Sequence, residues 1–143
     1  MGADKVAMQY FQQGFNCAQS VLVSCGEGLD VITALKVSCA FGGGMSRMGE
    51  TCGVVTGAMM AIGLKFGMTD ADKPEAKAKT YQVVNDFVKE FKTRHKHITC
   101  TELIGCNLST PEGVLLAKEK KVHENICRTL IHDAVDILDG LLK

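Results

Sequence analysis

The sequence predicts an all-α protein, a compact bundle of about six to seven helices around a buried, glycine-rich central helix. Apolar residues recur at helical spacing along nearly the whole chain, as they do in amphipathic helices. No two-residue hairpin turn lies between segments of alternating apolar and polar residues, the pattern that would indicate paired strands. With 143 residues, 46% of them hydrophobic, the chain can bury one sizeable core. We therefore predict a single cysteine-rich helical domain over residues 1–143.

Three short helices are expected first, over residues 4–13, 17–25 and 31–40. Glycines follow each of these segments, and glycine is the residue that most readily ends a helix and allows a turn. The last of these glycine stretches is the run Gly42, Gly43 and Gly44, which we expect to form a loop.

The longest apolar run covers residues 52–64 and is predicted to be the buried central helix. It is shorter than the roughly 20 residues that span a bilayer, so no membrane span is expected. Two pairs of glycines spaced by four, Gly53 with Gly57 and Gly63 with Gly67, would let another helix approach closely.

The second half of the chain predicts a long amphipathic helix and several shorter ones. The long helix is expected to begin at Pro74 and Glu75 and to end near the basic cluster at residues 94–97. A capping box predicts a short helix after Thr99, and further helices are expected over residues 110–120 and 126–141.

Charge and composition narrow the classes of function. Sixteen Lys and Arg balance 16 Asp and Glu, so no overall basic field exists to hold a nucleic-acid backbone. The seven cysteines are an odd number, and the N-terminal residues do not resemble a signal peptide. We therefore expect a cytoplasmic protein, in which surplus cysteines fill the core, bind metal or carry redox chemistry.

Three cysteines are predicted to be the first residues of helices. An asparagine or a threonine, both good N-cap residues, directly precedes each of Cys17, Cys52 and Cys100. The positive end of a helix stabilises a thiolate, so these positions favour reactive or metal-ligating cysteines. We expect Cys52 to be the most acidic thiol, because Arg47 lies nearby in the sequence and can add positive charge.

The remaining cysteines receive different interpretations. Cys25 and Cys39 lie among apolar residues and are expected to fill the core as small hydrophobic side chains. Cys106 follows a short apolar segment and is either core filler or a spare thiol. Cys127, in the first turns of the last helix, is a further candidate for the functional site.

A family resemblance rests on these cysteines and on the segment from Phe41 to Gly57. The chain resembles the redox-active protein family named for one cysteine, a Cys-Gly-Ala-x-x-Gly motif and two later cysteines. The resemblance assigns the four characteristic cysteines to Cys17, Cys52, Cys100 and Cys127, although Cys106 competes with Cys100 for the third place. Val54 stands where the family has alanine. The resemblance implies a redox role and suggests a bound Fe–S cluster, without a defined reaction or substrate.

The chemistry of such a site has several alternatives. The sequence has no Cys-x-x-Cys pair, so any site must be assembled by tertiary packing. Converging thiolates can act as a thiol–disulfide couple, or they can bind an Fe–S cluster or another metal. The predicted cofactor-binding residues are Gly42, Gly43, Gly44 and Arg47, which can approach an anion. His123 and His132 share a helical face, which is weak evidence for metal binding.

Two function hypotheses follow from these residues. The first is a cysteine-based redox or electron-transfer protein, in which Cys17, Cys52, Cys100 and Cys127 are the catalytic or metal-binding residues. Such a protein would be an oxidoreductase component with a redox partner protein, and it is compatible with a homo-oligomer. The second is a non-catalytic helical interaction module whose cysteines hold a structural metal or fill the core.

Overall fold

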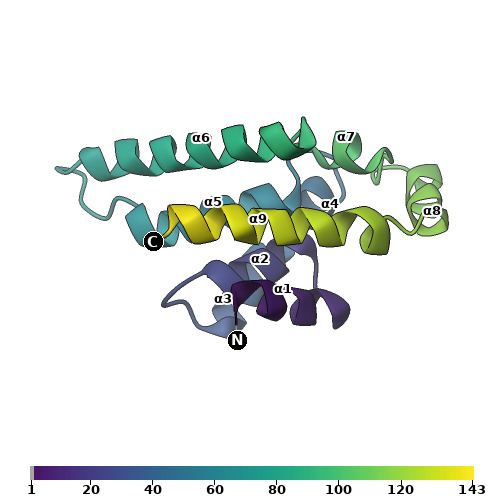
Figure 1. The fold of residues 1–143 in the computed structure, drawn as a ribbon, viewed down its shortest axis with the longest axis horizontal. Coiled ribbons are helices and arrows are strands. Elements are labelled where there is room, and N and C mark those ends of the chain that lie inside the picture. The colour runs from purple at the N-terminus through teal and green to yellow at the C-terminus, as the bar shows by residue number, and fades with distance from the viewer. Residues whose placement is uncertain (1) are drawn as a thin grey trace.

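A computed structural model describes residues 2–143, and in this range the chain forms helices and no β-strand (Figure 1). The longer helices are α1 (Ala3–Gln12), α2 (Cys17–Cys25), α3 (Val31–Cys39), α5 (Gly53–Phe66), α6 (Glu75–His95), α8 (Pro111–Glu119) and α9 (Arg128–Leu141). The shorter ones are α4 (Gly42–Met45), α7 (Cys100–Ile104) and the π-helical turn η1 (His123–Cys127). The predicted all-α class is confirmed, and the expected six to seven helices match the seven longer ones.

The central helix α5 packs directly on α2, and glycine makes the close approach possible. A Cβ atom on Gly53 would lie 2.8 Å from the backbone nitrogen of Ala18, and one on Gly57 would lie 2.9 Å from its carbonyl oxygen. Both distances are shorter than a carbon can tolerate. The first glycine pair therefore faces the neighbouring helix as expected, whereas a Cβ on Gly63 would meet nothing within 4 Å.

The long helices α6 and α9 lie side by side and run in opposite directions (Figure 1). Phe87 and Phe91 of α6 are completely buried. At the end of α6, Arg94 Nη2 lies 2.9 Å from Asp136 Oδ2 of α9, and His95 Nε2 lies 2.7 Å from Oδ2 of Asp133. The Arg94–Asp136 ion pair and the His95–Asp133 contact join the end of α6 to α9.

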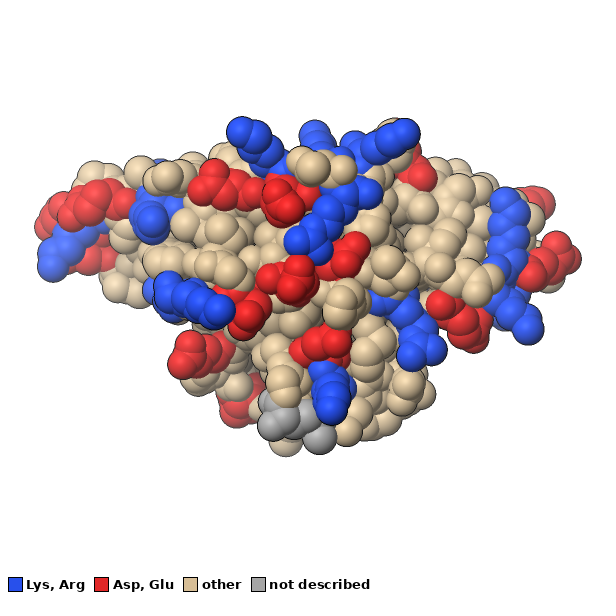
Figure 2. Space-filling model, viewed as in Figure 1, with Lys and Arg blue, Asp and Glu red and all other residues tan. Residues whose placement is uncertain are grey.

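The outer face of α6 and α9 mixes charges of both signs. In Figure 2, basic and acidic side chains alternate over this face without forming a continuous basic patch. Nucleic-acid binding proteins usually concentrate Lys and Arg on one face. Among residues 2–143, none of the helices combines the length and the apolar character that crossing a membrane requires.

The helix α3 lies at the edge of the bundle and packs mainly on α2 (Figure 1). Only Ala34 and Ser38 of this helix are buried, while Ile32 is 68% exposed. The expectation that Cys39 fills the core is therefore wrong, because Cys39 lies at the exposed end of α3. Its apolar neighbours in the sequence point largely to solvent rather than into the core.

Candidate functional site

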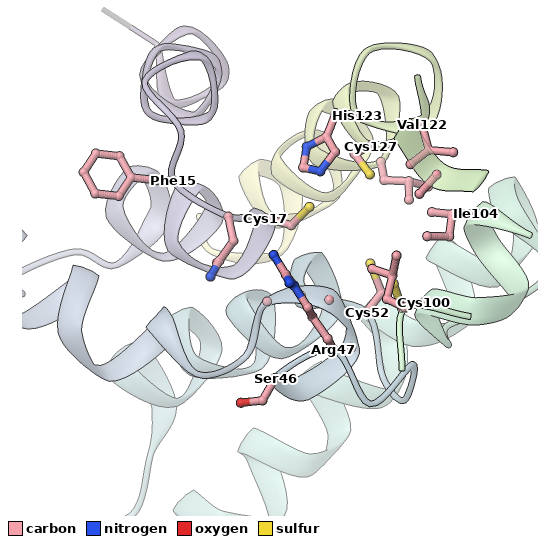
Figure 3. Close-up of a pocket in the computed structure, with 18 of the residues that line it drawn as sticks. Phe15, Cys17, Ser46, Arg47, Cys52, Cys100, Ile104, Val122, His123 and Cys127 are labelled. Atoms are coloured by element: carbon pink, nitrogen blue, oxygen red, sulfur yellow. The ribbon is translucent and has the colours of Figure 1, made fainter. Parts of the chain in front are cut away.

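One cavity of about 420 Å³ brings together cysteines that are widely separated in the sequence (Figure 3). The cysteines that line it are Cys17, Cys39, Cys52, Cys100 and Cys127. The floor is buried and apolar, with Ile104 and Leu130 beside the sulfur atoms, whereas the rim contains exposed polar side chains. The cavity is therefore a thiol-lined space that opens to solvent on one side.

Cys17 lies at the start of α2, where the sequence predicts it. The Asn16 side chain accepts a hydrogen bond of 2.9 Å from the amide of Gln19, and the Gln19 side chain accepts one of 2.9 Å from the amide of Asn16. This reciprocal capping box fixes the first turn of the helix. The Asn16 amide group also donates to the carbonyl oxygen of Cys39 at 2.9 Å, so the end of α3 is tied to the start of α2.

Cys52 and Cys100 are held next to each other by their backbones. The amide of Cys52 donates to the carbonyl oxygen of Ile98 at 2.7 Å, and the amide of Cys100 donates to that of Glu50 at 2.7 Å. Cys100 is the first residue of α7, as predicted. Cys52 is the N-cap residue of α5, whereas the sequence predicts it to be the first residue of that helix. Thr51, the predicted N-cap residue, is instead part of an isolated β-bridge.

Cys127 reaches the cavity from the far end of the chain. It is the last residue of η1 and directly precedes α9, so a single π-helical turn sets the direction of its side chain. The thiols of Cys17 and Cys127 lie close enough for each to shift the pKa of the other. Figure 3 shows the sulfur atoms of Cys17, Cys52 and Cys127 around the same space.

The Cys17–Cys127 pair is the most acidic part of this cluster. The neighbouring Cys17 thiol lowers the pKa of Cys127 more than burial raises it, and the backbone amide of Cys127 also stabilises its thiolate. The neighbouring Cys127 raises the pKa of Cys17 well above its ordinary value, with burial adding to the effect. The pair therefore loses its first proton easily and its second with difficulty.

The other two thiols of the cluster are less acidic. Burial raises the pKa of Cys52 to about 12, although the amides of Val54 and Val55 act in the opposite direction. Burial also raises the pKa of Cys100 to about 11. The expectation that Cys52 is the most acidic thiol is wrong, because removing its thiolate from water outweighs the helix terminus.

The glycine-rich segment forms one wall of the cavity and has an unusual backbone. Residues 43–47 all have positive φ angles, so the expected loop is a left-handed turn. Gly44 is needed here for a second reason, since a Cβ atom on it would lie 2.7 Å from the Cβ of Cys100. Gly42, Gly43 and Gly44 all line the cavity, and the side chain of Arg47 extends across it toward Cys17 (Figure 3).

The remaining cysteines lie outside the buried cluster. Cys106 is buried beside α7, where its thiol donates to the carbonyl oxygen of Ile104 at 3.6 Å, and it does not line the cavity. Of the two alternatives for the third position, the structure therefore brings Cys100 to the cavity. Cys25 is half-buried and lies elsewhere, whereas Cys39 is at the rim.

His123 is a rim residue that sequence reasoning did not assign to the site. Its ring stacks on Phe11 with the ring centroids 5.4 Å apart, and it lines the cavity. The sequence does contain a signal that could have placed His123 at the site. His123 and Cys127 are four residues apart, and residues at this spacing lie on one helical face. The other candidate, His132, lies elsewhere and has its Nδ1 atom 2.8 Å from Asp4 Oδ1.

The thiols of the cavity are not arranged as the ligands of a single metal ion. Within residues 2–143, no group of three or more His, Cys, Asp or Glu side chains is placed to hold one metal ion. The cavity thus collects soft thiol ligands without placing three of them around one ion. Cys17, Cys52, Cys100 and Cys127 are the residues that would hold a four-iron Fe–S cluster, in which each cysteine binds a different iron atom.

Fold and site together define a class of all-helical proteins in which cysteines from distant helix ends meet at one cavity. Over residues 15–141 the chain matches the family described as "Putative redox-active protein (C_GCAxxG_C_C)", and it belongs to that family. Comparisons with curated proteins and with solved structures gave no match. The family resemblance noted from the cysteine pattern is thereby confirmed.

Proposed function

We propose that this protein is a thiol–disulfide oxidoreductase whose reacting pair is Cys17 and Cys127. The observation that carries the proposal is that these two cysteines, far apart in the sequence, line one cavity and lie close enough to shift each other's pKa. Disulfide exchange requires a thiolate to attack and a second sulfur close enough to complete the bond. The lowered pKa of Cys127 supports the first requirement, and the position of Cys17 on the same cavity supports the second.

The reaction is a two-electron exchange with a substrate disulfide. The Cys127 thiolate attacks one sulfur of the substrate, which forms a mixed disulfide and releases the other half as a thiolate that takes up a proton. Cys17 then loses its proton and attacks the sulfur of Cys127, which releases the second half as a thiol. The substrate gains two electrons and two protons, and the Cys17–Cys127 pair is oxidised to a disulfide.

Cys52 and Cys100 are proposed as the slower members of the same site. Their raised pKa values keep them as thiols near neutral pH, so they do not start the exchange. Both line the same cavity as Cys17 and Cys127, so they are able to exchange more slowly with a disulfide formed there. This order of reaction follows from acidity and burial together.

The alternative of a single thiolate-bound metal ion has less support, because the described side chains contain no set of three ligands placed around one ion. An Fe–S cluster held by the four cysteines of the cavity is a separate alternative. No step of the proposed reaction uses a metal. The alternative of a non-catalytic helical module predicts that the cysteines do not change redox state. We also propose a cytoplasmic setting, since all seven cysteines are free and reducing compartments maintain that state.

A redox titration tests the proposal. The purified protein is equilibrated in a series of reduced and oxidised dithiothreitol mixtures, and its free thiols are trapped and counted by mass spectrometry. Anaerobically purified protein is assayed in parallel for iron and zinc and by absorption spectroscopy. We expect two thiols to be lost in one step in the wild type and in Cys25→Ser, but not in Cys17→Ser or Cys127→Ser.

Two results would overturn the proposal. Thiols that stay reduced across the whole series would favour the non-catalytic module. Stoichiometric iron with visible absorption bands, bound by the same four cysteines, would favour the metal centre.

A further inference from the structure

The two ends of the cavity differ in polarity. Its buried end is formed by sulfur atoms and apolar side chains, and its exposed end includes Ser46, Arg47 and His123. A substrate that enters must therefore pass the rim before it reaches Cys127. The volume of about 420 Å³ is that of a small-molecule site rather than of a groove for a folded partner.

The permanent charge that lines this cavity is positive only. Among the described residues that line it there is no aspartate or glutamate, and Arg47 is the one permanently charged side chain. None of the ion pairs found within residues 2–143 involves Arg47. The whole chain has a formal net charge of zero, so any attraction for anions must come from this local charge.

The backbone holds Arg47 in place over the cavity. Its amide donates to the carbonyl oxygen of Gly42 at 3.1 Å, and its own φ angle of 64° is in the left-handed region. The amides of Gly49 and Glu50 donate to Gly43 and Gly44 at 3.2 and 2.9 Å, which closes the turn. Figure 3 shows the guanidinium group directed toward Cys17, while Arg47 as a whole is an exposed residue at the rim.

We propose that the substrate of this site is a small disulfide that carries a carboxylate group. Arg47 binds the carboxylate through its planar fork of donors, which matches the two carboxylate oxygens. One sulfur of the ligand then lies near Cys127, where the exchange described above takes place. This inference rests on the proposed function and adds to it the size and charge of the substrate.

The test compares three small disulfides of similar size and different charge. Reduced protein is mixed with dithiodiglycolate, with neutral bis(2-hydroxyethyl) disulfide or with cationic cystamine, and the rate of thiol loss is measured. Each rate is divided by the rate of the same disulfide with 2-mercaptoethanol, which removes the intrinsic reactivity of the compound. We expect the wild type to favour dithiodiglycolate over the neutral disulfide by about three- to tenfold.

Two variants show whether Arg47 is the cause. Arg47→Gln removes the charge and is expected to abolish the preference, while Arg47→Lys retains the charge and part of the preference. The matched control is Lys36→Gln, because Lys36 is an exposed cation of α3 that does not line the cavity. This control is expected to react like the wild type with all three compounds.

A trapping experiment identifies the attacked residue. In Cys17→Ser the fast second step is removed and only the slower Cys52 and Cys100 remain, so shortly after mixing dithiodiglycolate should leave a mixed disulfide on Cys127 that mass spectrometry locates in a peptide digest. Attachment to Cys39, the exposed thiol at the rim, would overturn the placement of the ligand.

The outcomes separate this inference from the function on which it rests. If all three disulfides oxidise the Cys17–Cys127 pair with equal relative rates, the pair is a redox couple and the anion preference is wrong. If only a protein disulfide, such as oxidised thioredoxin, reacts with the pair, the small-molecule substrate is wrong. If no disulfide oxidises the pair, the proposed function itself fails.

Discussion

Thr51 and Thr99 form an isolated antiparallel β-bridge, the one place among residues 2–143 where two extended segments pair. The bridge places the residues that follow them, Cys52 and Cys100, side by side at the starts of α5 and α7. Both cysteine amides are hydrogen-bonded within it, at 2.7 Å each. The floor of the cavity is therefore set by backbone pairing, whereas Cys17 and Cys127 are placed by helix packing.

The four cavity thiols are expected to react with iodoacetamide in a defined order. Near pH 7, Cys127 should be labelled well before Cys52 and Cys100, because its pKa is lowered while theirs are raised by burial. Removing the neighbouring thiol in Cys17→Ala should slow the labelling of Cys127, because Cys17 lowers its pKa, and Cys25→Ala should not. Residue-by-residue mass spectrometry measures the rates, and faster labelling of Cys52 than of Cys127 would contradict the proposed order.

The stability of the reduced protein is expected to fall in alkaline solution. The pKa of Cys52 is raised to about 12 and that of Cys100 to about 11, from an ordinary value of 9.0 in the unfolded chain. Between these values the unfolded chain releases protons that the folded protein retains, so the free energy of unfolding falls as the pH rises above about 9. Below about pH 9, Cys52 and Cys100 do not change the free energy of unfolding with pH.

Urea unfolding at pH 8 and pH 10 in the presence of a reductant measures this effect. Each buried thiol adds a slope of at most about 1.4 kcal/mol per pH unit. Other groups titrate in the same range, so the comparison is made with Cys52→Ser, which should lose part of the slope. An identical slope in the variant and in the wild type would show that Cys52 is not buried as a thiol.

Two glycines of α5 are expected to respond to alanine in opposite directions. Gly53→Ala places a methyl group against the backbone of α2, so we expect it to lower the free energy of unfolding by about 1–3 kcal/mol. Gly63→Ala has open space and a better helix former, so a gain of up to about 1 kcal/mol is expected. Thermal unfolding checks both, and equal effects of the two substitutions would contradict the close α2–α5 contact.

Most of the helices could be predicted from the sequence, because capping residues and apolar spacing agree on where they begin. Asn16 and Thr99 cap the helices that begin at Cys17 and Cys100, as expected. Pro111 begins α8 in the same way. These signals are local, since each depends on residues within one turn of the chain.

The parts of the site that could not be predicted depend on contacts between distant segments. The burial that raises the pKa of Cys52 comes from the surrounding helices, and the neighbouring residues in the sequence do not report it. The exposure of Cys39 follows from the position of α3 at the edge of the bundle. The left-handed backbone at Met45, Ser46 and Arg47 is also hidden from the sequence, because non-glycine residues rarely adopt it.

The identity of the first disulfide that forms tests the proposed reacting pair most directly. Reduced protein is treated with slightly less than one equivalent of a small disulfide, alkylated at low pH and digested, and the linked peptides are identified by mass spectrometry. We predict a bond between Cys17 and Cys127, the two cavity cysteines that shift each other's pKa in opposite directions. A first bond between Cys52 and Cys100, or one that includes Cys25, would contradict this prediction.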